Sequence, residues 1–201
     1  MTDTESQSPI KLNHQERVTL VDLARSAIMH RLTHSTAPTP DERSMTEALK
    51  TPSGAFVSLH VEEELRGCIG SIYAEEPLAQ IVAHMAVQAA TQDPRFAPMQ
   101  TSDLSKTDIE VSVLSELVPM VPDDVQVGVH GLLISKGSRR GLLLPQVPGQ
   151  YGWTRAEFLS QLCLKAGLPD RSWTDPTCRL LMFTADVFSD STLFGDEDDD
   201  Y

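Results

Sequence analysis

The chain has 201 residues, 40% of them hydrophobic, which suffices for one good core or two small ones but not for several independent domains. Its formal net charge is −13, and the only Lys/Arg cluster is Lys136–Arg140, so the sequence argues against a nucleic-acid partner. Polar residues interrupt the longest apolar stretch, and the N-terminus has no basic flank, which argues against a membrane span or secretory signal.

The first predicted element is a helix that follows a polar leader. Residues 1–10 contain little apolar material, and residues 191–201 form a tail that contains a run of acidic residues, so we expect both ends to be disordered. Asn13 is a good N-cap, and apolar residues recur at helical spacing from Val18 to Leu32. The proline-containing segment 36–40 is expected to end this helix.

Residues 54–115 are predicted to form a β-β-α-β unit. Alternating apolar and polar residues between turn signals predict strands, and apolar residues at helical spacing after a proline predict a helix. The expected elements are strands at Ala55–His60 and Leu65–Ile72, a helix from Pro77 to about Asp93, and a strand at Ile109–Leu114.

The same order of elements returns in residues 131–188. The expected elements are strands at Gly131–Ser135 and Arg140–Pro145, a helix at Thr154–Ala166 and a strand at Arg179–Phe188. Pro77 and Thr154, which begin the two helices, are about 77 residues apart. We therefore predict an α+β fold of two lobes, each an antiparallel sheet with helices, built from a repeated β-β-α-β unit; coincidence is the alternative. A seam between two lobes is a usual place for a ligand site.

The second strand of the first hairpin contains the best candidate site. Period two places Arg66, Cys68 and Gly70 on one face and the apolar Leu65 and Ile69 on the core face. Residues two apart in a strand have Cα atoms about 7 Å apart, so the guanidinium of Arg66 could stabilise a thiolate at Cys68. The thiolate is the reactive form of cysteine.

Two glycines flank the cysteine in this strand. Gly67 and Gly70 cost stability inside a strand, and such glycines often mark a bulge or the close approach of another backbone or a ligand. The alternative is that Cys68 is a small buried hydrophobe and that the glycines ease strand packing.

Polar residues on neighbouring segments could complete the site. Glu110 and Ser112 share the polar face of the third strand, and Glu110 could pair with Arg66, either in catalysis or as a structural ion pair. Asp93 and Arg95 could form a structural bracket after the helix, or Arg95 could bind an anion.

The histidines and cysteines of the sequence indicate a candidate general base and a reducing cellular compartment. His130 precedes the second hairpin and could act as a general base, although a surface or structural role is the alternative. The chain has three cysteines, an odd number, and no CxxC pair, which suits a reducing cytoplasm and predicts no metal site. Neither GxGxxG nor a P-loop is present, so any cofactor stays open.

Six segments together resemble the AMMECR-type domain family, known in microbes as AmmeMemoRadiSam system protein A. They are Leu65–Gly70 (LRGCIG), Asp93–Phe96 (DPRF), Ile109–Leu114 (IEVSVL), Gly141–Val147 (GLLLPQV), Gly152–Trp153 and Leu164–Leu168 (LKAGL). The resemblance implies a single two-lobed domain, residues 11–190, with the LRGCIG strand facing the lobe interface. The family's microbial name also implies Memo-like and radical-SAM-like partners, but no reaction is implied.

The resulting functional hypothesis is an enzyme of small-molecule or peptide modification that acts at an inter-lobe cleft centred on the LRGCIG strand. Cys68 would be the nucleophile or thiolate ligand, Arg66 would stabilise it, and Glu110, Arg95 or His130 would assist. The candidate binding residues are Gly67, Gly70, Asp93 and Ser112. The alternative is a non-catalytic ligand-binding or adaptor module that uses the same cleft.

Overall fold

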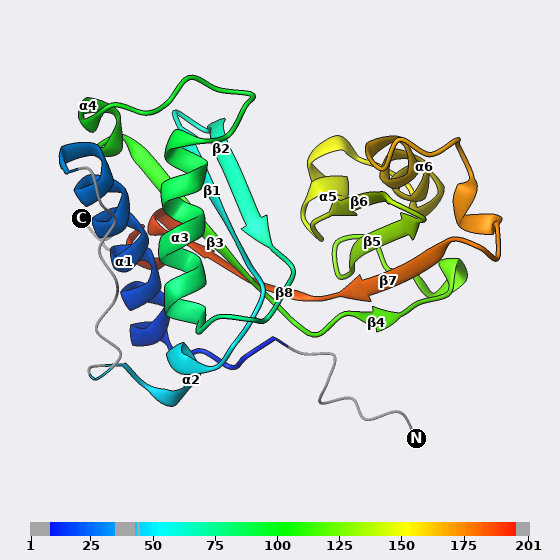
Figure 1. Ribbon diagram of the computed structural model, residues 1–201, viewed down its shortest axis with the longest axis horizontal. Helices are drawn as coiled ribbons and strands as arrows, with labels where there is room; N and C mark the ends of the chain where they lie inside the picture. Colours follow the sequence, from blue (N-terminus) through cyan, green and yellow to red (C-terminus); the bar gives the residue numbers. More distant parts are fainter. Residues whose placement is uncertain (1–8, 35–42, 44, 196–201) are drawn as a thin grey trace, which may run out of the picture. The chain divides into compact units, whose positions relative to one another are not determined.

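The computed structural model describes residues 9–34, 43 and 45–195, which form two compact units (Figure 1). The first unit contains Ile10–Leu114 and the described residues from Asp186 onward, and the second is built on Ser115–Ala185. Each contains one four-stranded sheet, which confirms the predicted α+β class. No described helix is long and apolar enough to cross a membrane. The predicted helix breaker at 36–40 and most of the leader lie outside the described residues.

The first unit is a sheet with strand order β2-β1-β3-β8. Its strands are β1 (Ala55–Val61), β2 (Glu64–Ser71), β3 (Thr107–Leu114) and β8 (Ala185–Ser189), and its helices are α1 (His14–Thr33), α2 (Glu47–Lys50), α3 (Leu78–Thr91), α4 (Thr101–Leu104) and α7 (Asp190–Phe194). β1 pairs antiparallel with both β2 and β3. β2 is therefore an edge strand.

The core of the first unit lies where α1 and α3 meet the sheet. α1 begins at the predicted N-cap, where Asn13 and Glu16 form a reciprocal capping box. α3 contacts β1 and β2, α1 contacts β3, and the two helices contact each other (Figure 1). Leu20, Leu59 and Val82 are fully buried there, and each contributes about 1.5–3 kcal/mol of hydrophobic stabilisation.

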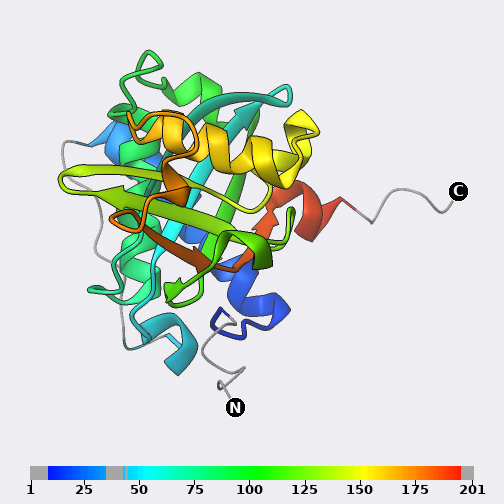
Figure 2. The same ribbon diagram turned by 90° about the vertical axis from the view of Figure 1, so that its right-hand side faces the viewer.

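The second unit has strand order β4-β7-β5-β6. Its strands are β4 (Val118–Pro119), β5 (Gly131–Lys136), β6 (Arg139–Leu143) and β7 (Arg179–Phe183), and its helices are α5 (Val147–Tyr151) and α6 (Arg155–Lys165), with 3-10 turns at Pro122–Asp124 and Ser172–Thr174. α6 lies over the sheet and contacts β5 and β6 (Figure 2). Leu132, Ile134, Phe158 and Leu162 form the centre of this core.

The repeated β-β-α-β order is confirmed in the topology. The first repeat arranges its strands as β2-β1-β3 and the second as β6-β5-β7, with the helix inserted at the same point in each. The fourth strand of each sheet follows the other repeat in the chain: β4 follows β3 but pairs with β7, and β8 follows β7 but lies beside β3. The seam predicted between the two halves stays a prediction.

Two sequence-based expectations about the end of the chain were wrong. The predicted strand Arg179–Phe188 is two strands in different sheets, because the N–H and C=O of Thr184 bond to the Oγ and N–H of Ser115. The predicted disordered tail, 191–201, begins too early, because α7 extends to Phe194 and its first residue, Asp190, pairs with Arg25. Residues 196–201 lie outside the described part of the chain.

Candidate functional site

A β-bulge interrupts the strand that contains the candidate cysteine. Leu59 of β1 is opposite Gly67 and the next residue, His60, is opposite Leu65, so Arg66 is an extra residue on β2. The expectation that Leu65 faces the core is therefore wrong, and this side chain is 38% exposed. The alternation argument failed because one inserted residue exchanges the two faces for all residues beyond it.

Cys68 lies in a row of three side chains that crosses three strands. It is directly opposite Ser58 of β1, which is directly opposite Glu110 of β3, so all three share one face of the sheet. The Ser58 hydroxyl donates a hydrogen bond to Cys68 Sγ at 3.3 Å. The next row on this face contains Gly70, Phe56 and the buried Ser112.

Arg66 projects from the bulge and has a main-chain partner. Its Nη1 donates to the carbonyl of Ala97 at 3.0 Å, which attaches β2 to the loop that follows α3. The predicted ion pair between Arg66 and Glu110 stays a prediction.

The loop after α3 also clamps the main chain of Cys68. The Cys68 N–H donates to Asp93 Oδ2 at 2.9 Å, and Arg95 Nη2 donates to the Cys68 carbonyl at 3.4 Å. Arg95 in turn holds both carboxylate oxygens of Asp93, through Nε at 3.0 Å and Nη2 at 2.7 Å. Asp93 and Arg95 therefore form a bracket on the outer edge of β2, where no further strand can satisfy these main-chain groups.

The interactions within the bracket shift the pKa values of both Asp93 and Arg95. Hydrogen bonds from Arg95 and the amide of Cys68 hold the pKa of Asp93 well below its usual value, although burial opposes the shift. The Asp93 carboxylate raises the pKa of Arg95, and the Cys68 thiol adds a smaller effect in the same direction. Arg95 therefore contacts the main chain of Cys68, whereas strand spacing had selected Arg66 as the arginine beside this residue.

Packing accounts for both glycines of the signature strand. A Cβ on Gly67 would lie 2.2 Å from the Ala89 carbonyl oxygen, so α3 rests directly on this strand. A Cβ on Gly70 would lie 2.2 Å from Cγ of the Phe56 ring. Neither glycine requires a ligand to explain its presence.

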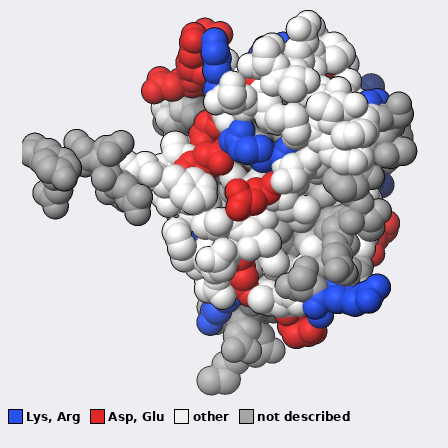
Figure 3. Space-filling view, turned by 90° about the vertical axis from the view of Figure 1, so that its left-hand side faces the viewer, with Lys and Arg blue, Asp and Glu red and all other residues white. Residues whose placement is uncertain are grey.

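His130 belongs to the second unit, in the loop before β5. Its Nδ1 accepts a hydrogen bond of 3.2 Å from the Gln126 N–H, and burial lowers the pKa of the ring. Among the described residues, no group of three or more His, Cys, Asp or Glu is arranged to hold a metal ion. On the face shown in Figure 3, described acidic and basic side chains lie among one another, and most of the surface carries neither.

Comparison with known proteins identifies the family. The family model described as AMMECR1 matches residues 21–188, which include Ser115–Ala185, most of the first unit and the LRGCIG strand. The chain belongs to the AMMECR1 family. This confirms the resemblance that the six segments had indicated.

Relatives in the AMMECR1 family are similar along most of their length. Protein MK0488 of Methanopyrus kandleri is 42% identical over 90% of this chain and 91% of its own. Protein TK0174 of Thermococcus kodakarensis is 43% identical over 85% of this chain and 88% of its own. The crystal structure of the uncharacterized protein PH0010 from Pyrococcus horikoshii matches with a TM-score of 0.79 and 38% identity, over 85% of this chain and 89% of that chain.

Ser58 was not identified from the sequence as a residue of the candidate site. Ser58 lies in an unremarkable strand, and nothing in its local sequence links it to Cys68. The hairpin register would have identified it, because Ser58 is directly opposite Cys68. That register depends on recognising the bulge at Arg66.

Proposed function

We propose that this protein is an enzyme that modifies a small molecule or a peptide, with Cys68 as its nucleophile. The observation that supports this role is the hydrogen bond from Ser58 to the half-buried thiol of Cys68, next to the contact of Arg95 with the main chain of the same residue. A neighbouring guanidinium favours the thiolate, which is the nucleophilic form of cysteine.

The clamped main chain would position the nucleophile. Asp93 and Arg95 hold the N–H and C=O of Cys68, so the sulfur is carried by a strand that is fixed at that residue. Glu110 lies on the same face beyond Ser58, where it would assist as a proton acceptor. Arg66 and His130 are retained as secondary candidates, Arg66 on the same strand and His130 in the second unit.

The setting and partners are part of the same proposal. Three free cysteines suit a reducing cytoplasm. Memo-like and radical-SAM-like proteins are proposed as partners, because the microbial name of the family associates the three kinds of protein.

The alternative is a non-catalytic ligand-binding or adaptor module. It is supported by the structural contacts in the same region: α3 occupies the space beside Gly67, and the bracket satisfies the edge of the sheet without any ligand. In that case Cys68→Ser should fold and retain biological function in cells. Loss of function in a folded Cys68→Ser variant would support the enzyme.

The decisive experiment measures how fast iodoacetamide alkylates Cys68 in the native protein at a series of pH values. Mass spectrometry quantifies the alkylated Cys68. We expect Cys68 to react at lower pH than a free thiol, whose pKa is about 8.5, and Arg95→Gln to slow the reaction at pH 7. Arg95→Lys keeps the positive charge, so its alkylation rate should lie between that of the original protein and that of Arg95→Gln. Arg155→Gln is the control, because this exposed arginine pairs with Asp123 in the second unit. An inert Cys68, or a rate unchanged by Arg95→Gln, would contradict the proposal.

A further inference from the structure

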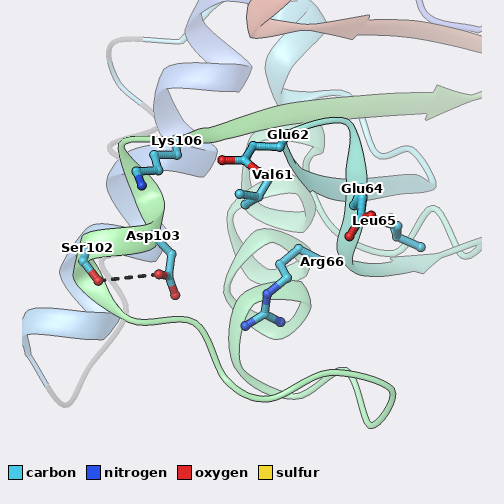
Figure 4. Close-up of a pocket in the computed structure, with 8 residues that line it drawn as sticks. All are labelled: Val61, Glu62, Glu64, Leu65, Arg66, Ser102, Asp103 and Lys106. Carbon is cyan, nitrogen blue, oxygen red and sulfur yellow. Dashed lines mark hydrogen bonds between the residues drawn. The ribbon is translucent and has the colours of Figure 1, made fainter.

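A hollow of ≈ 400 Å³ lies in the first unit between two chain segments (Figure 4). One wall is the β1–β2 hairpin, with Glu62, Glu64, Leu65 and Arg66. The other wall is α4 and the residues before β3, with Asp103 and Lys106. This volume lies within the usual range of small-molecule sites, about 300–1,000 Å³.

Each wall of the hollow carries both signs of charge. Asp103 is engaged in capping α4, where its carboxylate accepts the Gln100 N–H at 2.9 Å. In the part of the chain that the structure describes, the Lys106 ammonium and the Glu62 and Glu64 carboxylates form no ion pair. These three groups are therefore available to a ligand.

The backbone presents two of these charged side chains in unusual ways. Glu62 and Glu63 form the two-residue β1–β2 turn with φ of 52° and 68°, a conformation that normally selects Gly, Asn or Asp. The Glu62 carboxylate points toward the wall that contains Lys106 (Figure 4). The β-bulge adds Arg66 to the same hollow. A strained turn and a bulge thus both direct charge into one place, as is common at functional sites.

We propose that this hollow binds a small zwitterion, namely an α-amino acid with an apolar side chain. The ligand carboxylate would lie between Arg66 and Lys106, and its ammonium would meet Glu62 and Glu64, in charge-assisted hydrogen bonds. Val61 and Leu65 are the apolar residues that line the hollow, and Val61, which lies between Glu62 and Arg66 in Figure 4, would contact the ligand side chain. A ligand with one charge would leave the opposite charges of the hollow unmatched. This binding does not require a reaction at Cys68, although it shares Arg66 with the proposed function.

The first test is a titration of the full chain with L-leucine. Binding is monitored by NMR through the amide resonances of residues 61–66 and 102–106. We expect saturable shifts in both segments. N-acetyl-L-leucine lacks the ammonium and L-leucinamide lacks the carboxylate, so each should bind about tenfold more weakly or worse. Absence of saturable shifts, or equal binding of either analogue, would overturn the proposal.

The second test uses matched variants of the hairpin. Glu62→Gln and Lys106→Gln should each weaken L-leucine binding about tenfold, because each removes one charged partner. Glu63→Gln is the control, since Glu63 shares the turn and its positive φ but does not line the hollow. A thermal unfolding scan establishes that each variant is folded. The proposal is wrong if Glu63→Gln weakens binding as much as Glu62→Gln, or if neither Glu62→Gln nor Lys106→Gln weakens it.

Discussion

The main-chain N–H of Cys68 donates a 2.9 Å hydrogen bond to the carboxylate of Asp93, whose side chain is only 2% exposed. These residues are 25 positions apart in the chain. Because β2 is an edge strand, the carboxylate takes the place of a neighbouring strand and fixes the residue that carries the candidate nucleophile. The DPRF segment therefore holds the LRGCIG strand in place. Loss of this contact should change both the stability of the fold and the reactivity of Cys68.

Asp93→Asn should destabilise the protein by about 2–3 kcal/mol at pH 7, because it weakens charge-assisted hydrogen bonds at a buried carboxylate. The pKa of Asp93 is lowered in the folded state, so the unfolded chain takes up the proton first as the pH falls. The stability that Asp93 contributes is therefore complete above its unfolded pKa of about 4 and is lost progressively as the pH falls from there toward the lower folded pKa. Urea unfolding of the original protein and of Asp93→Asn, monitored by circular dichroism between pH 3 and 7, measures the difference in their free energies of unfolding. Asp123→Asn is the control, since its ion pair with Arg155 is exposed and should contribute less than about 1 kcal/mol.

Gly67→Ala should destabilise the fold by about 2–3 kcal/mol, because its methyl group would overlap the Ala89 carbonyl oxygen and force α3 away from β2. Gly141→Ala should behave similarly, since its Cβ would lie 2.7 Å from the Ala166 nitrogen. Gly149→Ala is the contrasting control: nothing lies within 4 Å of its Cβ, and alanine favours the helix by about 0.5–1 kcal/mol. Equal unfolding free energies for Gly67→Ala and Gly149→Ala would show that the close contact is unimportant.

Cys68 and Cys163 should differ sharply in reactivity in the native protein. Cys163 is fully buried, and burial raises the pKa of its thiol, so it should be labelled at least about 100-fold more slowly than Cys68. In denaturant all three thiols should react at similar rates. Quantitative mass spectrometry after brief iodoacetamide exposure measures each site. Faster native labelling of Cys163 than of Cys68 would contradict the proposed assignment of the nucleophile.

Glu62→Asn and Glu63→Asn should each stabilise the protein by about 1 kcal/mol, because asparagine tolerates positive φ better than glutamate. Glu64→Asn is the control, since Glu64 lies in β2, where asparagine is disfavoured and no gain is expected. The midpoints of urea unfolding distinguish these cases. A loss of stability in both turn variants would mean that the glutamate side chains support the fold.

Most secondary structure was predictable because its signals are local. Asn13 and Thr154 were recognised as the residues that begin two helices, and both form capping boxes in the structure. The strands β1, β3 and β5 lie within one or two residues of their predicted bounds. Repetition of the same local pattern also indicated the β-β-α-β order in both halves.

The candidate site was only partly predictable. Cys68, Glu110 and Ser112 do share one face of the sheet, as period two had suggested for each strand separately. Leu65 was placed on the wrong face, and Arg66 was not recognised as an extra residue, because the bulge changes the register of the hairpin. Ser58 was missed because its importance arises only from the residue opposite it.

The sequence by itself determined the family, the order of the elements and the segment that contains Cys68, since caps, periodicity and motifs involve residues close together in the chain. Tertiary structure alone decided which strand completes each sheet, where the bulge falls and that Asp93 and Arg95 hold the main chain of Cys68. Those features depend on which distant backbone groups satisfy one another. A local sequence pattern contains no record of that choice.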